Sequence, residues 1–146
     1  MEDLVKSMKV ALATVFSFYL KAHNFHWNVE GPNFHEYHTM FQKIYEDVYG
    51  SVDVFAEQIR ALDDFAPGSY KRFGELSKVA DETKVPTGLV MVERLLADNE
   101  IVIGVLDEAM KLATTHNKQG LMNFLGERID QHNKWGWFLR ATKKDK

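Results

Sequence analysis

Apolar residues recur at three- and four-residue steps over four long segments of the chain, 3–29, 34–63, 88–114 and 119–142. This spacing places them on one face of an α-helix, so each segment is predicted to be amphipathic and helical. In the first segment the apolar stripe consists of Met8, Leu12, Val15, Tyr19 and Ala22, and it continues into His26. A histidine on a face that is otherwise buried needs a polar partner.

The connections between these segments contain the three prolines, Pro32, Pro67 and Pro86. Segments 30–33 and 116–118 are short and predict antiparallel helix pairs, whereas 64–86 is long and carries a possible short helix at 70–77. We expect Thr87 to cap the third long helix. Two hairpins joined by one long crossover define a ferritin-like arrangement. The predicted fold is therefore an all-α, ferritin-like four-helix bundle with an extra short helix between helices two and three, forming one domain over 1–146.

The composition of the chain excludes several kinds of site and partner. The 146-residue chain has no cysteine, which excludes a disulfide framework and a thiolate metal site. Its net charge of −3 argues against strong attraction to nucleic acid, although the C-terminus is locally basic. Neither a signal peptide nor a membrane-spanning segment is recognisable. We therefore expect a cytoplasmic protein without a membrane partner and with weak or absent DNA binding, and association with the nucleoid stays open.

Four residues of metal-ligand type lie on the first two predicted helices. His26 and His38 flank the first turn, so an antiparallel hairpin brings them to one end of the bundle. Asp53 and Glu57 are four residues apart and share a helix face. Asp53 follows His38 by 15 residues, which is roughly 22 Å of helical rise. One metal ion cannot reach both ends within one chain.

A second copy of the chain removes this difficulty, because it brings the two pairs of residues together. In a two-fold dimer with antiparallel second helices and an axis near Asp47, His26 and His38 of one subunit meet Asp53 and Glu57 of the other. Symmetry then creates two identical sites. Imidazole together with carboxylate suits iron, manganese or zinc. The Glu-x-x-His pairs of a di-iron site within one bundle are absent from the sequence.

The same residues carry a motif that resembles the Dps family, the mini-ferritins. At the first turn the motif reads His26-Trp27-Asn28-Val29-Glu30-Gly31-Pro32-Asn33-Phe34, and His38 follows it. On the second helix it continues as Asp53-Val54-Phe55-Ala56-Glu57-Gln58-Ile59-Arg60. Residues 68–73 match the family in the crossover, and residues 137–141 match it in the last helix. The resemblance covers nearly the whole chain.

This resemblance implies a hollow dodecamer that oxidises ferrous iron, preferably with hydrogen peroxide but also with dioxygen, and stores the ferric mineral inside. It implies ferroxidase sites at two-fold interfaces, with His26 and His38 from one subunit and Asp53 and Glu57 from the other. Trp27 would lie beside the site as a packing residue and an electron donor. Such a protein protects against oxidative damage.

One position departs from the family pattern. Where the family often has an aspartate four residues after the second histidine, this chain has Gln42, a poorer iron ligand. Binding of a second iron could then be weak or be assisted by His23 or His35. The acidic residues of the last two helices are candidates for a surface that faces the mineral, namely Asp98, Glu100, Asp107, Glu127 and Asp130.

Two alternatives stay open at this point. The first is a cage that binds zinc or another metal at the same residues and serves as a structural or DNA-protecting particle without efficient ferroxidase activity; Gln42 supports it. The second is a helical-bundle adaptor with buried histidines, which forms no dodecamer.

Overall fold

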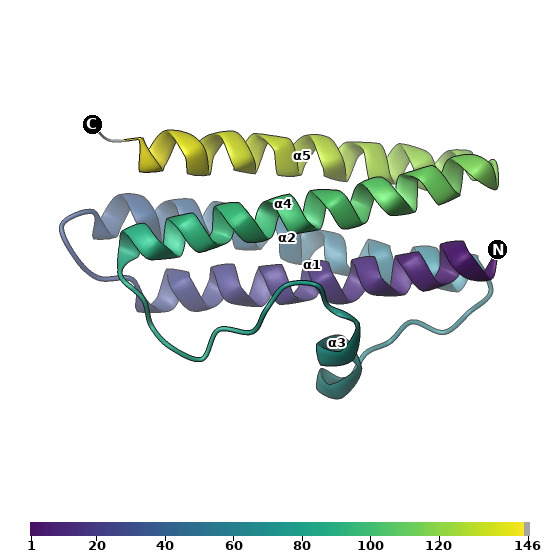
Figure 1. The fold of residues 1–146 in the computed structure, drawn as a ribbon, viewed down its shortest axis with the longest axis horizontal. Coiled ribbons are helices and arrows are strands. Elements are labelled where there is room, and N and C mark those ends of the chain that lie inside the picture. Colours follow the sequence, from purple (N-terminus) through teal and green to yellow (C-terminus); the bar gives the residue numbers. More distant parts are fainter. Residues whose placement is uncertain (145–146) are drawn as a thin grey trace.

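The computed structural model describes residues 1–144, and these form four long helices and one short one (Figure 1). The long helices are α1 (Glu2–Asn28), α2 (Phe34–Ala61), α4 (Gly88–Thr115) and α5 (Gln119–Lys143), and the short helix is α3 (Tyr70–Leu76). Every predicted helix is present, and its ends fall within about two residues of the predicted ones. The predicted crossover helix is confirmed as α3.

The four long helices lie side by side, and α3 packs against the outer side of α1 (Figure 1). Helix α1 is the most deeply buried because it contacts α2, α4 and α3. Its predicted stripe is confirmed, since Met8, Leu12, Val15 and Ala22 are almost completely buried. The first turn and the C-terminal end of α5 lie at the same end of the bundle (Figure 1).

Backbone conformation explains the tight turns. Gly31 has a φ of 121°, which L-residues with a side chain rarely adopt, and it reverses the chain between α1 and α2. Asn117 has a φ of 56° between α4 and α5, in the left-handed region that asparagine tolerates well. Thr87 occupies the predicted N-cap position of α4, but its side chain forms no capping hydrogen bond with any residue in 1–144.

A hydrogen-bonded polar network crosses the interior between α2, α4 and α5. Arg128 donates two hydrogen bonds of 2.9 Å to the Asp47 carboxylate, which also accepts one of 2.8 Å from the Trp135 indole. Arg128 also donates to His132 Nε2, and the His132 Nδ1–H donates to the side-chain oxygen of Asn99. The network ties α5 to two other helices.

Burial and the nearby Arg128 guanidinium lower the pKa of His132 to about 3, so its ring is neutral. Burial raises the pKa of Asp47, but the hydrogen bonds from Arg128 and Trp135 outweigh that effect and the net shift is downward. His132 is therefore a structural residue.

The prediction that acidic residues of the last two helices form a surface facing the mineral is wrong for Asp98. Asp98 is buried and lies 2.8 Å from the ammonium of Lys21 on α1, so it cannot face a mineral within this subunit. Burial raises the pKa of Asp98, and the Lys21 contact opposes that rise. Within residues 1–144, no helix is long and apolar enough to span a membrane.

Candidate metal centre

The α1–α2 hairpin brings His26 and His38 into direct contact. Their rings are stacked with centroids 3.8 Å apart and an interplanar angle of 15°. His26 is buried near the C-terminal end of α1, and His38 is half-buried on the second turn of α2. The predicted proximity of the two histidines is confirmed.

Two reciprocal hydrogen bonds fix both rings. The Nδ1–H of His26 donates to the main-chain carbonyl of His38 at 2.8 Å, and the Nδ1–H of His38 donates to the carbonyl of His26 at 2.7 Å. A carbonyl oxygen only accepts, so each Nδ1 must carry the proton. In the neutral form of such a ring the lone pair is on Nε2, and this is the form that binds a metal ion.

Gln42 lies one turn after His38 on α2. Its side-chain Nε2 donates a hydrogen bond of 3.2 Å to the carboxylate of Glu46, the next turn along the helix. This bond orients the amide and identifies its Oε1 as the atom available for a water or a metal ion. An amide oxygen carries no net charge, so it neutralises less of a metal ion's charge than a carboxylate does.

Asp53 and Glu57 are both exposed on the second half of α2, far from the histidine pair along the helix. Neither carboxylate forms an ion pair with another residue in 1–144. Within those residues, three or more His, Cys, Asp or Glu side chains do not come together as a metal-binding group. One chain therefore brings together two of the four predicted ligands and leaves the other two facing solvent.

An aromatic cluster that the sequence analysis did not predict lies beside His26. The His23 ring stacks on Tyr45 with a centroid distance of 3.8 Å and lies 4.0 Å from the Trp27 ring. The Tyr19 hydroxyl and His23 Nδ1 are hydrogen-bonded at 2.8 Å. A usable signal was present in the sequence, because Tyr19 and His23, like Tyr45 and Tyr49, are four residues apart and share a helix face.

Burial and the nearby His26 lower the pKa of His23, which keeps its ring neutral. Burial also raises the pKa of Tyr19, and the neighbouring Tyr49 and Tyr45 add to the rise. Trp27 packs against His23 and is 59% exposed in the single chain. His35 is exposed and packs edge-on against Phe34.

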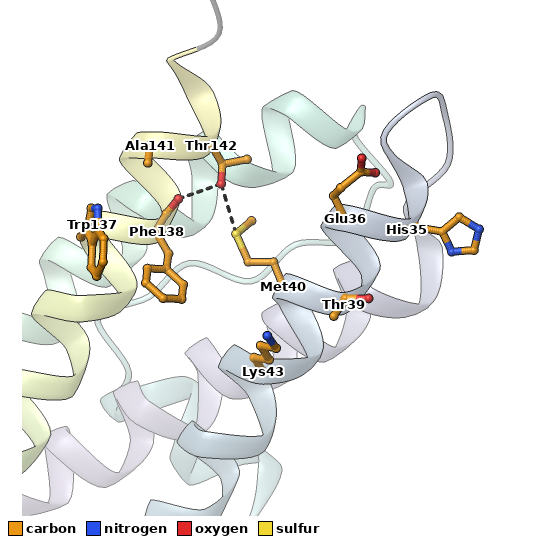
Figure 2. A pocket seen from close by; sticks show the side chains of 9 residues that line it. All are labelled: His35, Glu36, Thr39, Met40, Lys43, Trp137, Phe138, Ala141 and Thr142. Carbon is orange, nitrogen blue, oxygen red and sulfur yellow. Dashed lines mark hydrogen bonds between the residues drawn. The ribbon is translucent and has the colours of Figure 1, made fainter.

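An open apolar groove of about 710 Å³ lies between α2 and α5 at the same end of the bundle. Figure 2 shows the Trp137 and Phe138 rings of α5 on one side and Met40 and Lys43 of α2 on the other, with the His35 ring pointing away from Trp137. The groove does not include His26 or His38. Trp137 is 59% exposed in the single chain.

Comparison with known proteins agrees with this architecture. The ferritin-like domain model matches residues 6–145, which makes the chain a ferritin-like protein. It is 29% identical to "DNA protection during starvation protein 2" of Bacillus anthracis over 84% of each chain. The Dps structure from Staphylococcus aureus shares 27% identity, covers 100% of this chain and 98% of its own, and superposes with a TM-score of 0.94. The chain belongs to the Dps family of ferritin-like proteins.

A further structural similarity supports the fold alone. The Dps from Thermosynechococcus elongatus covers 99% of this chain and 92% of its own with a TM-score of 0.95, at 23% identity. The crossover helix α3 therefore belongs to a shared architecture.

Proposed function

We propose that the protein is a mini-ferritin that oxidises ferrous iron at sites shared between two subunits and stores the ferric product in a hollow homo-oligomeric shell. The observation that supports this most strongly is the pair of locked imidazoles, His26 and His38, each with its Nε2 available as a ligand. The exposed carboxylates of Asp53 and Glu57 complete the ligand set from a second copy. The Dps relatives support the shell, which we expect to be a dodecamer.

The ligand chemistry suits the oxidation. Two imidazoles provide neutral donors for Fe²⁺, and two carboxylates balance its charge. Because carboxylates stabilise the higher charge of Fe³⁺ more than that of Fe²⁺, this ligand set favours oxidation. One hydrogen peroxide molecule accepts two electrons from two ferrous ions and leaves two ferric ions and two hydroxides. Trp27 lies beside the site and is a candidate electron donor.

Assembly through α2 has further support in the surface of the single chain. Tyr49, Val54, Phe65 and Tyr70 are large apolar or aromatic residues with exposed fractions of 58%, 38%, 76% and 90%. Exposed apolar groups of this size, on α2 and on the crossover that follows it, are typical of a subunit interface. The Asp47 side chain is hydrogen-bonded to Arg128 within the bundle, so other residues form the outer face of α2.

A complementation experiment tests both the residues and their division between subunits. Chains with His26→Ala and His38→Ala are co-expressed with chains carrying Asp53→Asn and Glu57→Gln. Neither chain alone should oxidise ferrous iron faster than background with peroxide. Random pairing makes half of the dimers mixed, and each mixed dimer regains one of its two sites. We therefore expect about a quarter of the wild-type rate. Rates that stay at background in the mixture would contradict the shared site.

A second candidate function is supported by Gln42. Its neutral amide in place of a carboxylate fits a cage that binds zinc or manganese at the same residues and protects DNA or serves as a structural particle without efficient ferroxidase activity. Tight zinc binding with ferrous oxidation no faster than in the His26→Ala and His38→Ala chain would favour this function. DNA retention that falls with salt would distinguish a DNA-protecting particle.

A further inference from the structure

The polar network inside the bundle presents two side chains of metal-ligand type to a single atom of Arg128. An Asp47 carboxylate oxygen on α2 lies 2.9 Å from Arg128 Nη2, and His132 Nε2 on α5 lies 3.1 Å from the same nitrogen. The carboxylate oxygen and the imidazole nitrogen therefore converge on one point between the two helices. A carboxylate and an imidazole are also groups that bind iron, zinc and manganese in proteins.

The His132 ring is in the state that a metal ligand requires. A guanidinium only donates hydrogen bonds, so His132 Nε2 accepts from Arg128 and carries a lone pair. The His132 Nδ1–H donates to the Asn99 side-chain oxygen at 2.9 Å, and the Asn99 amide donates to the main-chain carbonyl of His132 at 2.8 Å. Histidines that bind metal ions are oriented through their second ring nitrogen in the same way.

The Asp47 carboxylate has a second donor besides Arg128. The Trp135 indole donates to Asp47 Oδ2 at 2.8 Å, and Arg128 Nη1 donates to Oδ1 at 2.9 Å. The indole hydrogen bond does not involve the arginine. We therefore expect the carboxylate to keep its orientation toward the interior when the guanidinium is removed.

Arg128 is a costly residue at this position. It is 8% exposed, and its Nε is buried without a hydrogen-bond partner in residues 1–144. A buried ion pair often stabilises a fold no better than well-packed apolar side chains of similar volume. A buried donor without a partner adds a further cost. The arginine at this position therefore points to a role other than holding the helices together.

The guanidinium lies where helical bundles of this class can hold metal ions. Ferritin-like di-iron proteins bind their ions inside the bundle, through carboxylates and histidines that project inward from facing helices. In this chain the carboxylate of Asp47 and the imidazole of His132 project inward, but Arg128 lies between them. Its guanidinium fills the space of a metal ion and repels one through its positive charge.

We propose that Arg128 acts as a fixed cation in a latent metal site formed by Asp47 and His132, and that it keeps metal ions out of the bundle interior. This exclusion does not depend on the proposed ferroxidase function. Its consequence for iron rests on that function, because ferrous ions are then directed to the site shared between two subunits.

Loss of the guanidinium should open the latent site. Bonds from carboxylate oxygen and imidazole nitrogen to zinc are about 2.0–2.2 Å long. A metal ion at the position of Arg128 Nη2 therefore requires each of the two ligands to move by roughly 1 Å. Water molecules that enter the space left by the arginine side chain complete the coordination.

The test measures binding of Co²⁺ to the purified protein by equilibrium dialysis and by the visible absorption of the bound ion. The background chain carries His26→Ala and His38→Ala, which removes the imidazoles of the proposed shared site. The test variant adds Arg128→Ala to this background. The matched control adds Arg140→Ala instead, because Arg140 lies on the same helix and is exposed.

Two further chains identify the ligands and guard against misfolding. One combines Arg128→Ala with Asp47→Asn and His132→Gln in the same background, which removes both ligands. The other carries Arg128→Gln, whose shorter, neutral amide can still donate a hydrogen bond to Asp47. Circular dichroism with and without Co²⁺ shows which chains fold.

We expect Arg128→Ala to bind about one Co²⁺ per subunit, at least about tenfold more tightly than the background chain or Arg140→Ala. Arg128→Gln should bind with intermediate affinity. Affinity should return to background when Asp47→Asn and His132→Gln are added. Folding of Arg128→Ala that requires Co²⁺ would also support the inference, because metal binding then stabilises the fold.

Binding at the background level in a folded Arg128→Ala or Arg128→Gln chain would overturn the inference. Tight binding that survives the loss of Asp47 and His132 would overturn it as well, and so would failure of both arginine variants to fold even with Co²⁺ present. Failure of the wild type to oxidise ferrous iron would overturn the proposed function and leave the exclusion of metal ions by Arg128 standing.

Discussion

His26 and His38 each donate their Nδ1–H to the other's main-chain carbonyl, at 2.8 and 2.7 Å. The two acceptors belong to the C-terminal end of α1 and the N-terminal part of α2, so the bonds also join the two helices of the hairpin. This arrangement fixes the tautomer and the orientation of both rings before any metal ion arrives. Preorganisation of this kind reduces the ordering that metal binding would otherwise require.

Removal of either imidazole should therefore weaken metal binding strongly. We expect His26→Ala to bind zinc, used as a redox-inert probe, at least about 100-fold more weakly than wild type, because it loses a ligand. Isothermal titration under anaerobic conditions measures this change. The matched control is His35→Ala, since His35 is exposed one turn before His38. An equal loss of affinity in both variants would contradict the assignment.

A carboxylate at position 42 should strengthen the second metal position. We expect Gln42→Asp to bind the second ferrous ion about tenfold more tightly, because a charged oxygen replaces a neutral one and the bond to Glu46 is removed. Anaerobic equilibrium binding gives the number of ferrous ions per subunit. Gln119→Asp, an exposed position at the start of α5, tests whether added charge alone has the effect.

Asp47 should be important for stability because it neutralises Arg128, whose side chain is only 10% exposed. Asp47→Asn leaves that guanidinium without its counter-ion, and we expect a loss of about 2–4 kcal/mol in the free energy of unfolding. Urea denaturation at fixed protein concentration measures it. Asp64→Asn is the comparison, since the Asp64 carboxylate in the ion pair with Lys9 is exposed and should contribute much less to stability. Similar losses in the two variants would count against the network.

His132 should make stability depend on pH. Its pKa is lowered to about 3 in the folded protein from an ordinary value of 6.5. Between these two pH values the unfolded chain binds a proton at this residue and the folded chain does not. The stabilising effect is therefore complete above pH 6.5 and is lost as the pH falls toward 3. One such group contributes a slope of about 1.4 kcal/mol per pH unit between these values.

The variant His132→Gln tests this dependence. Its amide can still accept from Arg128 and donate to Asn99, but it does not titrate. We expect the stability of wild type to fall more steeply than that of the variant between pH 6.5 and 4.5, by about 1 kcal/mol per unit. Urea midpoints at several pH values provide both slopes, and parallel slopes would show that His132 is not responsible.

The helices and the histidine pair could be predicted from sequence because both depend on local spacing. Periodicity located each long helix, and a short turn with Gly31 forced His26 and His38 together. The Lys21–Asp98 ion pair could not be predicted, because its partners lie 77 positions apart on helices whose mutual rotation no local pattern determines. Asp98 was therefore interpreted as a surface acid. The hydrogen bond between Tyr19 and His23 was not predicted because Tyr19 belongs to the apolar stripe of the first helix, where we considered its ring and not its hydroxyl.

The separation of the histidines and the carboxylates along α2 has a consequence for newly made protein. In the proposed dimer, each subunit contributes the histidines of one site and the carboxylates of the other. An isolated subunit therefore has no complete site. At low concentrations of subunits, the number of complete sites then rises with the square of the protein concentration. On the proposed division of the site, a freshly synthesised chain cannot begin iron chemistry before a partner has docked. Reactive oxygen intermediates would then be kept away from unassembled protein.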